Sequence, residues 1–131
     1  MDVIIAYIGT AIVFFGLDFI WLSKAAGFYK REIGPLLLPK PNFVAAGIFY
    51  LFYVAGIVYF AVLPAFNGGG WHEALTSGAV LGFIAYATYD MTNLSTLKGW
   101  SWRICVVDIL WGTFLTGIAA VGGLWLVQAI S

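Results

Sequence analysis

Three aspartates, Asp18, Asp90 and Asp108, lie within or at the edge of apolar stretches that are long enough to cross a membrane. An ionised carboxylate is costly in hydrocarbon, so an acid at such a position is a candidate functional residue. Carboxyl groups that share a proton suit proton coupling or general acid–base chemistry. If they are ionised, their oxygens could instead hold a hard cation such as Mg²⁺ or Ca²⁺.

Polar and aromatic side chains accompany these acids. Residues three or four positions apart share one face of a helix, so each acid has companions that can lie beside it. The predicted binding cluster contains the acids and these companions: Asp18, Asp90, Asn93, Asp108, Tyr86, Tyr89, Trp21 and Trp111. No His lies among them, because the single His72 falls on the other side of the membrane. We therefore predict no metal centre of the His-containing kind and no cofactor.

The composition is that of a membrane protein. The 131-residue chain is 63% hydrophobic and 9% charged, whereas a soluble domain carries roughly 25% charged residues. The formal net charge is zero, which gives no electrostatic case for nucleic-acid binding. We therefore expect the lipid bilayer to cover most of the surface.

The elements that must position the acids are membrane-spanning helices, each of which needs about 20 apolar residues. Four suitable runs are present, at residues 3–22, 43–66, 74–94 and 104–130. Polar connections at 23–42 and 95–103 and a glycine-rich turn at 67–70 separate them. We predict a single all-α integral membrane domain over residues 1–131, with four transmembrane helices in an up-down bundle.

The basic residues predict the orientation. All six of them flank the first–second or third–fourth connection: Lys24, Lys30, Arg31, Lys40, Lys98 and Arg103. The other side carries Asp2, His72 and Glu73 without any Lys or Arg. Because cytoplasmic loops carry an excess of Lys and Arg, we predict cytoplasmic connections and outside termini. All three aspartates then lie near the cytoplasmic face.

The connection 23–42 has two interpretations. It could form a short interfacial helix carrying Phe28, Tyr29 and Ile33, or an ordinary solvated loop. Near the predicted helix ends lie three tryptophans that we expect to be interfacial anchors: Trp71, Trp100 and Trp102.

The two halves of the chain share a faint motif. Residues 18–23 and 90–95 both read Asp-x-x-x-Leu-Ser, at the same end of the first and third runs. The match is compatible with a parallel repeat of two helical hairpins, and equally with chance in apolar sequence. In either case each hairpin could contribute an acid to a shared site.

Small residues four positions apart predict close helix packing. The pattern occurs as Gly78-x-x-x-Gly82 in the third run and as Thr113-x-x-x-Gly117 and Thr116-x-x-x-Ala120 in the fourth. We attach no chemistry to it.

A structural interpretation of the acids stays open beside the functional one. The carboxylates could pair with Arg103, Lys98 or Lys24 and close helix ends. Asp108, in the first turns of its helix, would also be stabilised by the helix dipole.

Three motifs carry a resemblance to a known family. They are Tyr89-Asp90-x-Thr92-Asn93-Leu94, Asp108-x-x-Trp111-Gly112 and Leu17-Asp18-x-x-Trp21-Leu22. The chain resembles, over nearly its whole length, the bacterial membrane family catalogued as domain of unknown function 2177. The resemblance implies four membrane helices in the bacterial inner membrane and brings no established activity.

These observations favour a protein that binds or transports a cation or a small polar or amphiphilic molecule. Four helices leave little room for a central pore, so transport would need a homodimer. One alternative is a membrane enzyme, or a subunit of one, that acts on lipids or fatty acyl chains, with Asp90 or Asp108 as general acid or base. The other is a structural partner subunit.

Overall fold

The computed structural model describes residues 1–131 and contains helices but no strands. Three segments are long and apolar enough to cross a membrane: Asp2–Leu36, Phe43–Thr96 and Trp102–Ile130. The all-α fold is therefore confirmed, and the lengths of these segments are compatible with the predicted membrane class. The second segment has 54 residues and bends back on itself.

The first segment begins with α1 (Asp2–Ile33), followed by the 3₁₀ turn η1 (Gly34–Leu36). Residues 23–33, predicted to belong to a connection, instead continue α1. No proline occurs in this stretch before Pro35, which has no N–H to continue the helical hydrogen-bond ladder. The helix ends at Ile33, whose φ of −134° lies outside the helical region. The connection is thus shorter than predicted, and neither a separate interfacial helix nor a loop starts at Ser23.

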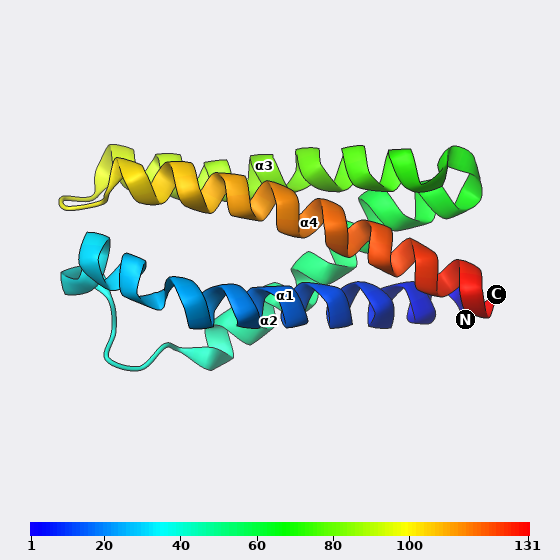
Figure 1. Ribbon diagram of the computed structural model, residues 1–131, viewed down its shortest axis with the longest axis horizontal. Coiled ribbons are helices and arrows are strands. Elements are labelled where there is room, and N and C mark those ends of the chain that lie inside the picture. Colours follow the sequence, from blue (N-terminus) through cyan, green and yellow to red (C-terminus); the bar gives the residue numbers. More distant parts are fainter.

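The second segment comprises α2 (Phe43–Ile57), the π-helical turns η2 (Val58–Val62) and η3 (Ala65–Gly69), and α3 (Gly70–Thr96). The chain reverses direction between η3 and α3 (Figure 1). Gly68 and Gly70 have φ values of 144° and 75° there, which glycine adopts without steric penalty. The reversal falls on the predicted glycine-rich turn.

The third segment is α4 (Trp102–Ile130), which begins after the cap residue Ser101. The Ser101 hydroxyl accepts hydrogen bonds from the N–H groups of Arg103 and Ile104, at 3.1 and 3.4 Å. This cap satisfies donors that a helix start leaves free.

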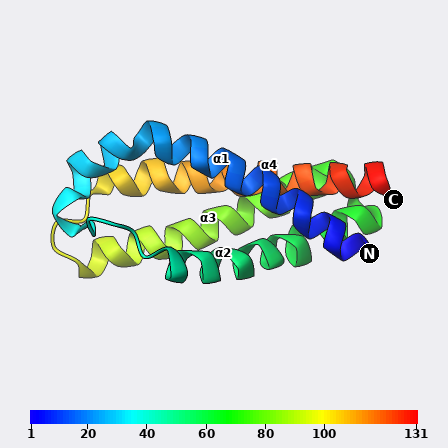
Figure 2. The same ribbon diagram turned by 90° about the horizontal axis from the view of Figure 1, so that it is seen from below.

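The helix α4 lies at the centre of the helix bundle. It contains more buried residues than any other helix and packs against both α1 and α3. The N- and C-termini lie at one end with the η3–α3 reversal, whereas both connections that carry the basic residues lie at the other (Figures 1 and 2). We call these the terminal end and the basic end.

A seam of small residues joins α3 to α4. A Cβ atom at Gly78 would lie 2.9 Å from the Thr116 carbonyl oxygen, and one at Gly82 would overlap the Gly112 carbonyl oxygen. Backbones this close leave no room for a side chain. The spacing Gly78-x-x-x-Gly82 therefore marks a real close approach.

Candidate functional site

A cavity of about 780 Å³ lies between the helices toward the basic end. Its wall comes from 21 residues, of which 16 are hydrophobic, and all four α-helices contribute. Leu37 and Trp100, from the two connections at this end, also belong to the wall. A volume of this size with an apolar lining and a few polar groups is typical of small-molecule sites.

The wall contains most of the predicted binding cluster: Asp18, Trp21, Tyr86, Tyr89, Asp90, Asp108 and Trp111. The remaining predicted residue, Asn93, is not part of it. Asn93 lies in the last turn of α3, where its carbonyl oxygen accepts the Leu97 N–H at 2.9 Å. One cavity thus receives all three acids, although they come from three different helices.

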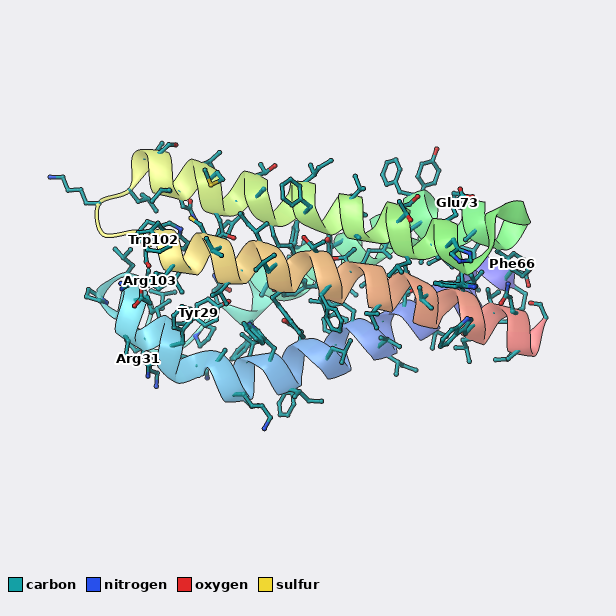
Figure 3. All side chains as sticks on the ribbon, turned by 45° about the horizontal axis from the view of Figure 1, so that its top comes forward. Tyr29, Arg31, Phe66, Glu73, Trp102 and Arg103 are labelled. Atoms are coloured by element: carbon teal, nitrogen blue, oxygen red, sulfur yellow. The ribbon has the colours of Figure 1, made fainter.

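Two of the acids accept hydrogen bonds from aromatic side chains of the wall. Asp18 Oδ1 accepts the Trp111 Nε1–H at 3.2 Å, and Asp108 Oδ1 accepts the Tyr29 hydroxyl at 2.7 Å. The Tyr29 oxygen in turn accepts the Trp21 Nε1–H at 3.3 Å. Tyr29 lies between α1 and α4 (Figure 3). One hydrogen bond thus has its donor on α4 and its acceptor on α1, and the other has its donor on α1 and its acceptor on α4.

The indoles of Trp21 and Trp111 stack on each other, with ring centroids 4.6 Å apart and planes inclined by 10°. Behind them lies a second, wholly apolar groove of about 290 Å³, lined by Trp21, Val107, Leu110, Trp111 and Phe114. Leu110 and Phe114 are exposed, so this groove is on the outer face of the helix pair. The stacked indoles therefore form part of both walls.

Asp90 on α3 differs from the other two acids. Its side chain has no exposed surface, and neither carboxyl oxygen has a hydrogen-bond partner. Its backbone carbonyl oxygen accepts the Cys105 thiol at 3.4 Å, a contact that ties α3 to α4 beside the cavity. Buried polar side chains without partners are rare in proteins, and a bound ligand is one explanation for such a group.

None of the three acids pairs with a basic residue. The single ion pair joins Arg103 Nη1 to Glu32 Oε2 at 3.8 Å, and Glu32 Oε1 also accepts the Ser101 hydroxyl at 2.5 Å. Asp108 is instead the ionisable neighbour that Asp18 and Asp90 share. The interpretation in which Lys24, Lys98 or Arg103 neutralises the acids is therefore wrong.

The acids are also not arranged as a metal site. No three His, Cys, Asp or Glu side chains come close enough together to hold a metal ion. Hard divalent cations take six to eight oxygen ligands, several of them carboxylate oxygens. The arrangement does not favour the hard-cation option that the sequence left open.

Five aromatic residues that line the wall were not among the predicted site residues: Tyr29, Phe49, Tyr50, Tyr53 and Trp100. Tyr29 could have been found, because it follows Trp21 by eight residues, two helical steps of four, and no helix breaker intervenes. Trp100 was expected to be an interfacial anchor, whereas its ring edge meets Tyr89 at a centroid distance of 5.7 Å. The Tyr and Phe residues of α2 carried no distinguishing signal, since that helix is apolar all round.

The fold and the cavity define a class, that of helical membrane proteins with a largely apolar internal cavity. Residues 3–125 match the family model described as "Predicted membrane protein (DUF2177)". The chain belongs to this family, as the motifs around Asp18, Asp90 and Asp108 predicted. Neither the curated proteins nor the solved structures contain a match to the chain.

Proposed function

We propose that this is a four-crossing membrane protein that binds a small amphiphilic organic cation in the cavity. The observation that carries the proposal is the presence of three acids without a basic partner in one largely apolar cavity. An amphiphilic cation matches both features, because its charge compensates the carboxylates and its apolar part fits the lining. Aromatic rings in the wall add cation–π attraction.

The four crossings rest on the η3–α3 reversal. On its own, α3 has 27 residues, more than the about 20 that span the hydrocarbon core. The distribution of Lys and Arg supports an orientation with the basic end in the cytoplasm of a bacterial cell and both termini outside. The cavity then faces the cytoplasmic side of the inner membrane.

A cysteine-labelling experiment tests this topology. In a Cys105→Ser background, single cysteines at positions 69 and 131 are expected to react with an impermeant maleimide added to intact cells. A cysteine at position 98 is expected to react only after the cells are opened. Labelling of position 98 in intact cells would reverse the orientation, and unequal labelling of 69 and 131 would contradict four crossings.

Binding is tested with four probes that share one chain: octylammonium, octyltrimethylammonium, 1-octanol and octanoate. The protein is reconstituted in lipid nanodiscs and titrated calorimetrically, with empty nanodiscs as the control for partitioning. Both cations are expected to bind at least tenfold more tightly than the alcohol and the anion. Equal binding of cations and alcohol would refute the proposal.

A second candidate, an enzyme acting on lipids or acyl chains, is favoured by the apolar lining of the cavity. Asp90 would be its general acid or base. Incubation of the protein with membrane lipids, followed by mass spectrometry, tests it. A new lipid product that Asp90→Asn abolishes would establish this candidate, and unchanged lipids would leave the binding function.

A further inference from the structure

Asp90 is the acid that receives no hydrogen bond from a donor of the protein. Trp111 already binds Asp18, and Tyr29 already binds Asp108, whereas both oxygens of Asp90 lack a donor. Its ionisable neighbour, Asp108, is also a carboxyl group, and two ionised carboxylates accept hydrogen bonds and donate none. Because Asp90 is shielded from bulk water, a cationic donor brought by the ligand would satisfy its oxygens and offset the repulsion from Asp108.

We propose that the ligand is a protonated amphiphilic amine bound through its N–H groups by Asp90, and not a quaternary ammonium compound. This inference rests on the proposed function and assigns its ligand class. An ammonium N–H and a carboxylate form a charge-assisted hydrogen bond, about twice as strong as a neutral one. A quaternary ammonium group has no N–H and would leave Asp90 unsatisfied, which is costly in a buried site.

The aromatic wall acts on both kinds of ammonium ligand. Cation–π attraction draws any ammonium group to the faces of rings. Trp21 and Trp111 cover one face of each other by stacking, and Trp100 meets Tyr89 edge to face, with an angle of 87° between the ring planes. The other rings of the wall attract an ammonium group with or without N–H groups, so they do not set the preference between the two.

Asp18 and Asp108 then have a different role from Asp90. Each holds an aromatic side chain of the wall in place, Asp18 directly through Trp111 and Asp108 through Tyr29. They are positioning residues that also contribute negative charge. Removal of either charge should weaken cation binding without changing the preference between amine types.

The experiment compares octylammonium with octyltrimethylammonium on the wild type and on three matched variants, Asp90→Asn, Asp18→Asn and Asp108→Asn. Titrations use protein in nanodiscs, and circular dichroism confirms that each variant is folded. The wild type is expected to prefer octylammonium about tenfold or more, as a charged hydrogen bond predicts. Asp90→Asn keeps an oxygen acceptor but loses the charge, so it should reduce this preference severalfold. Asp18→Asn and Asp108→Asn should retain the full preference with overall affinity reduced about threefold.

The outcomes separate the inference from the function on which it rests. Equal binding of the two cations by the wild type, with 1-octanol binding weakly, would overturn the inference and leave the proposed function intact. Binding of 1-octanol as tight as that of the cations, or of none of the probes, would overturn both. If Asp90→Asn does not fold, Asp90→Ser replaces it, and a preference retained in full by the folded variant would overturn the assignment of Asp90.

Discussion

The seam between α3 and α4 and the cavity toward the basic end use side chains of opposite size. Along the seam, Gly78 and Gly82 allow backbone-to-backbone contact with α4. Toward the basic end α3 and α4 diverge (Figure 2), and Tyr86 and Tyr89 of α3 and Trp111 of α4 line the cavity together with residues of α1 and α2. Small side chains thus accompany close contact of the two helices, and large ones line the space where the helices diverge.

Gly112 lies at the transition between the two regions. Its missing side chain leaves space for the ring of Tyr86, which a Cβ atom would overlap, and its carbonyl oxygen lies against Gly82. Gly112 thus faces both the seam and a residue of the cavity wall. Stability should therefore depend mainly on the seam, and ligand binding on the cavity.

The largest effect on stability is expected at the seam. Gly82→Ala places a methyl group against the Gly112 carbonyl oxygen and Thr116, and such overpacking should lower the free energy of unfolding by about 3 kcal/mol. Reversible unfolding in mixed micelles measures it. Gly16→Ala is the matched control, since nothing lies within 4 Å of that position. Equal losses of unfolding free energy for Gly82→Ala and Gly16→Ala would contradict the tight packing of the seam.

A smaller effect is expected in the cavity wall. Trp111→Phe keeps an aromatic ring but removes the donor to Asp18, which should lower the free energy of unfolding by about 2 kcal/mol. The same unfolding assay measures the change. Trp125, which is 61% exposed on the same helix, gives the control Trp125→Phe with little expected change. A loss for Trp111→Phe larger than that for Gly82→Ala would reverse the ranking.

The helix cap at the basic end should contribute less again. Ser101→Ala removes the acceptor for two backbone N–H groups and the hydroxyl bound to Glu32, so it should lower the unfolding free energy by about 1 kcal/mol. Ser23→Ala is a control, because Ser23 donates only to the Phe19 carbonyl oxygen within its own helix. Unfolding midpoints that do not separate these variants would contradict the role of the cap.

Asp90→Asn should have the smallest effect on stability. Because Asp90 has no hydrogen-bond partner to lose, the free energy of unfolding should change by no more than about 0.5 kcal/mol, or rise as a buried charge is removed. Thermal unfolding of the nanodisc-bound protein checks this. A loss of more than about 2 kcal/mol would mean that Asp90 stabilises the fold through a contact within the protein.

The sequence allowed the membrane class and the location of the candidate site to be predicted for a physical reason. Carboxylates in apolar runs are costly, so Asp18, Asp90 and Asp108 were informative wherever the helices would place them. The seam was also predictable, since Gly78-x-x-x-Gly82 has little other purpose in a membrane helix.

The partners of each acid could not be predicted. The helices are apolar on every side, so their periodicity does not indicate how each one is rotated about its axis. The bond from Tyr29 to Asp108 joins residues 79 positions apart. This hydrogen bond requires that α1 continue beyond Ser23. The charged residues of 23–33 had led us to predict a connection there instead of a helix. Asn93 was included for its spacing to Asp90, but it does not line the cavity, although the adjacent Thr92 does.

The parallel repeat of two hairpins stays a prediction. The motifs around Asp18 and Asp90 both contribute an acid to the cavity. The hairpins themselves differ, because α3 packs extensively on α4 whereas α1 packs mainly on α4 and little on α2. The shared use of the two acids does not require that the hairpins have a common origin.

The stacked indoles of Trp21 and Trp111 face the cavity on one side and the apolar groove on the other. A replacement that suited the ligand would at the same time alter the surface that meets the acyl chains. The two surfaces therefore cannot evolve independently at these positions. Adaptation of the protein to a new lipid environment and adaptation to a new ligand would compete for the same pair of residues.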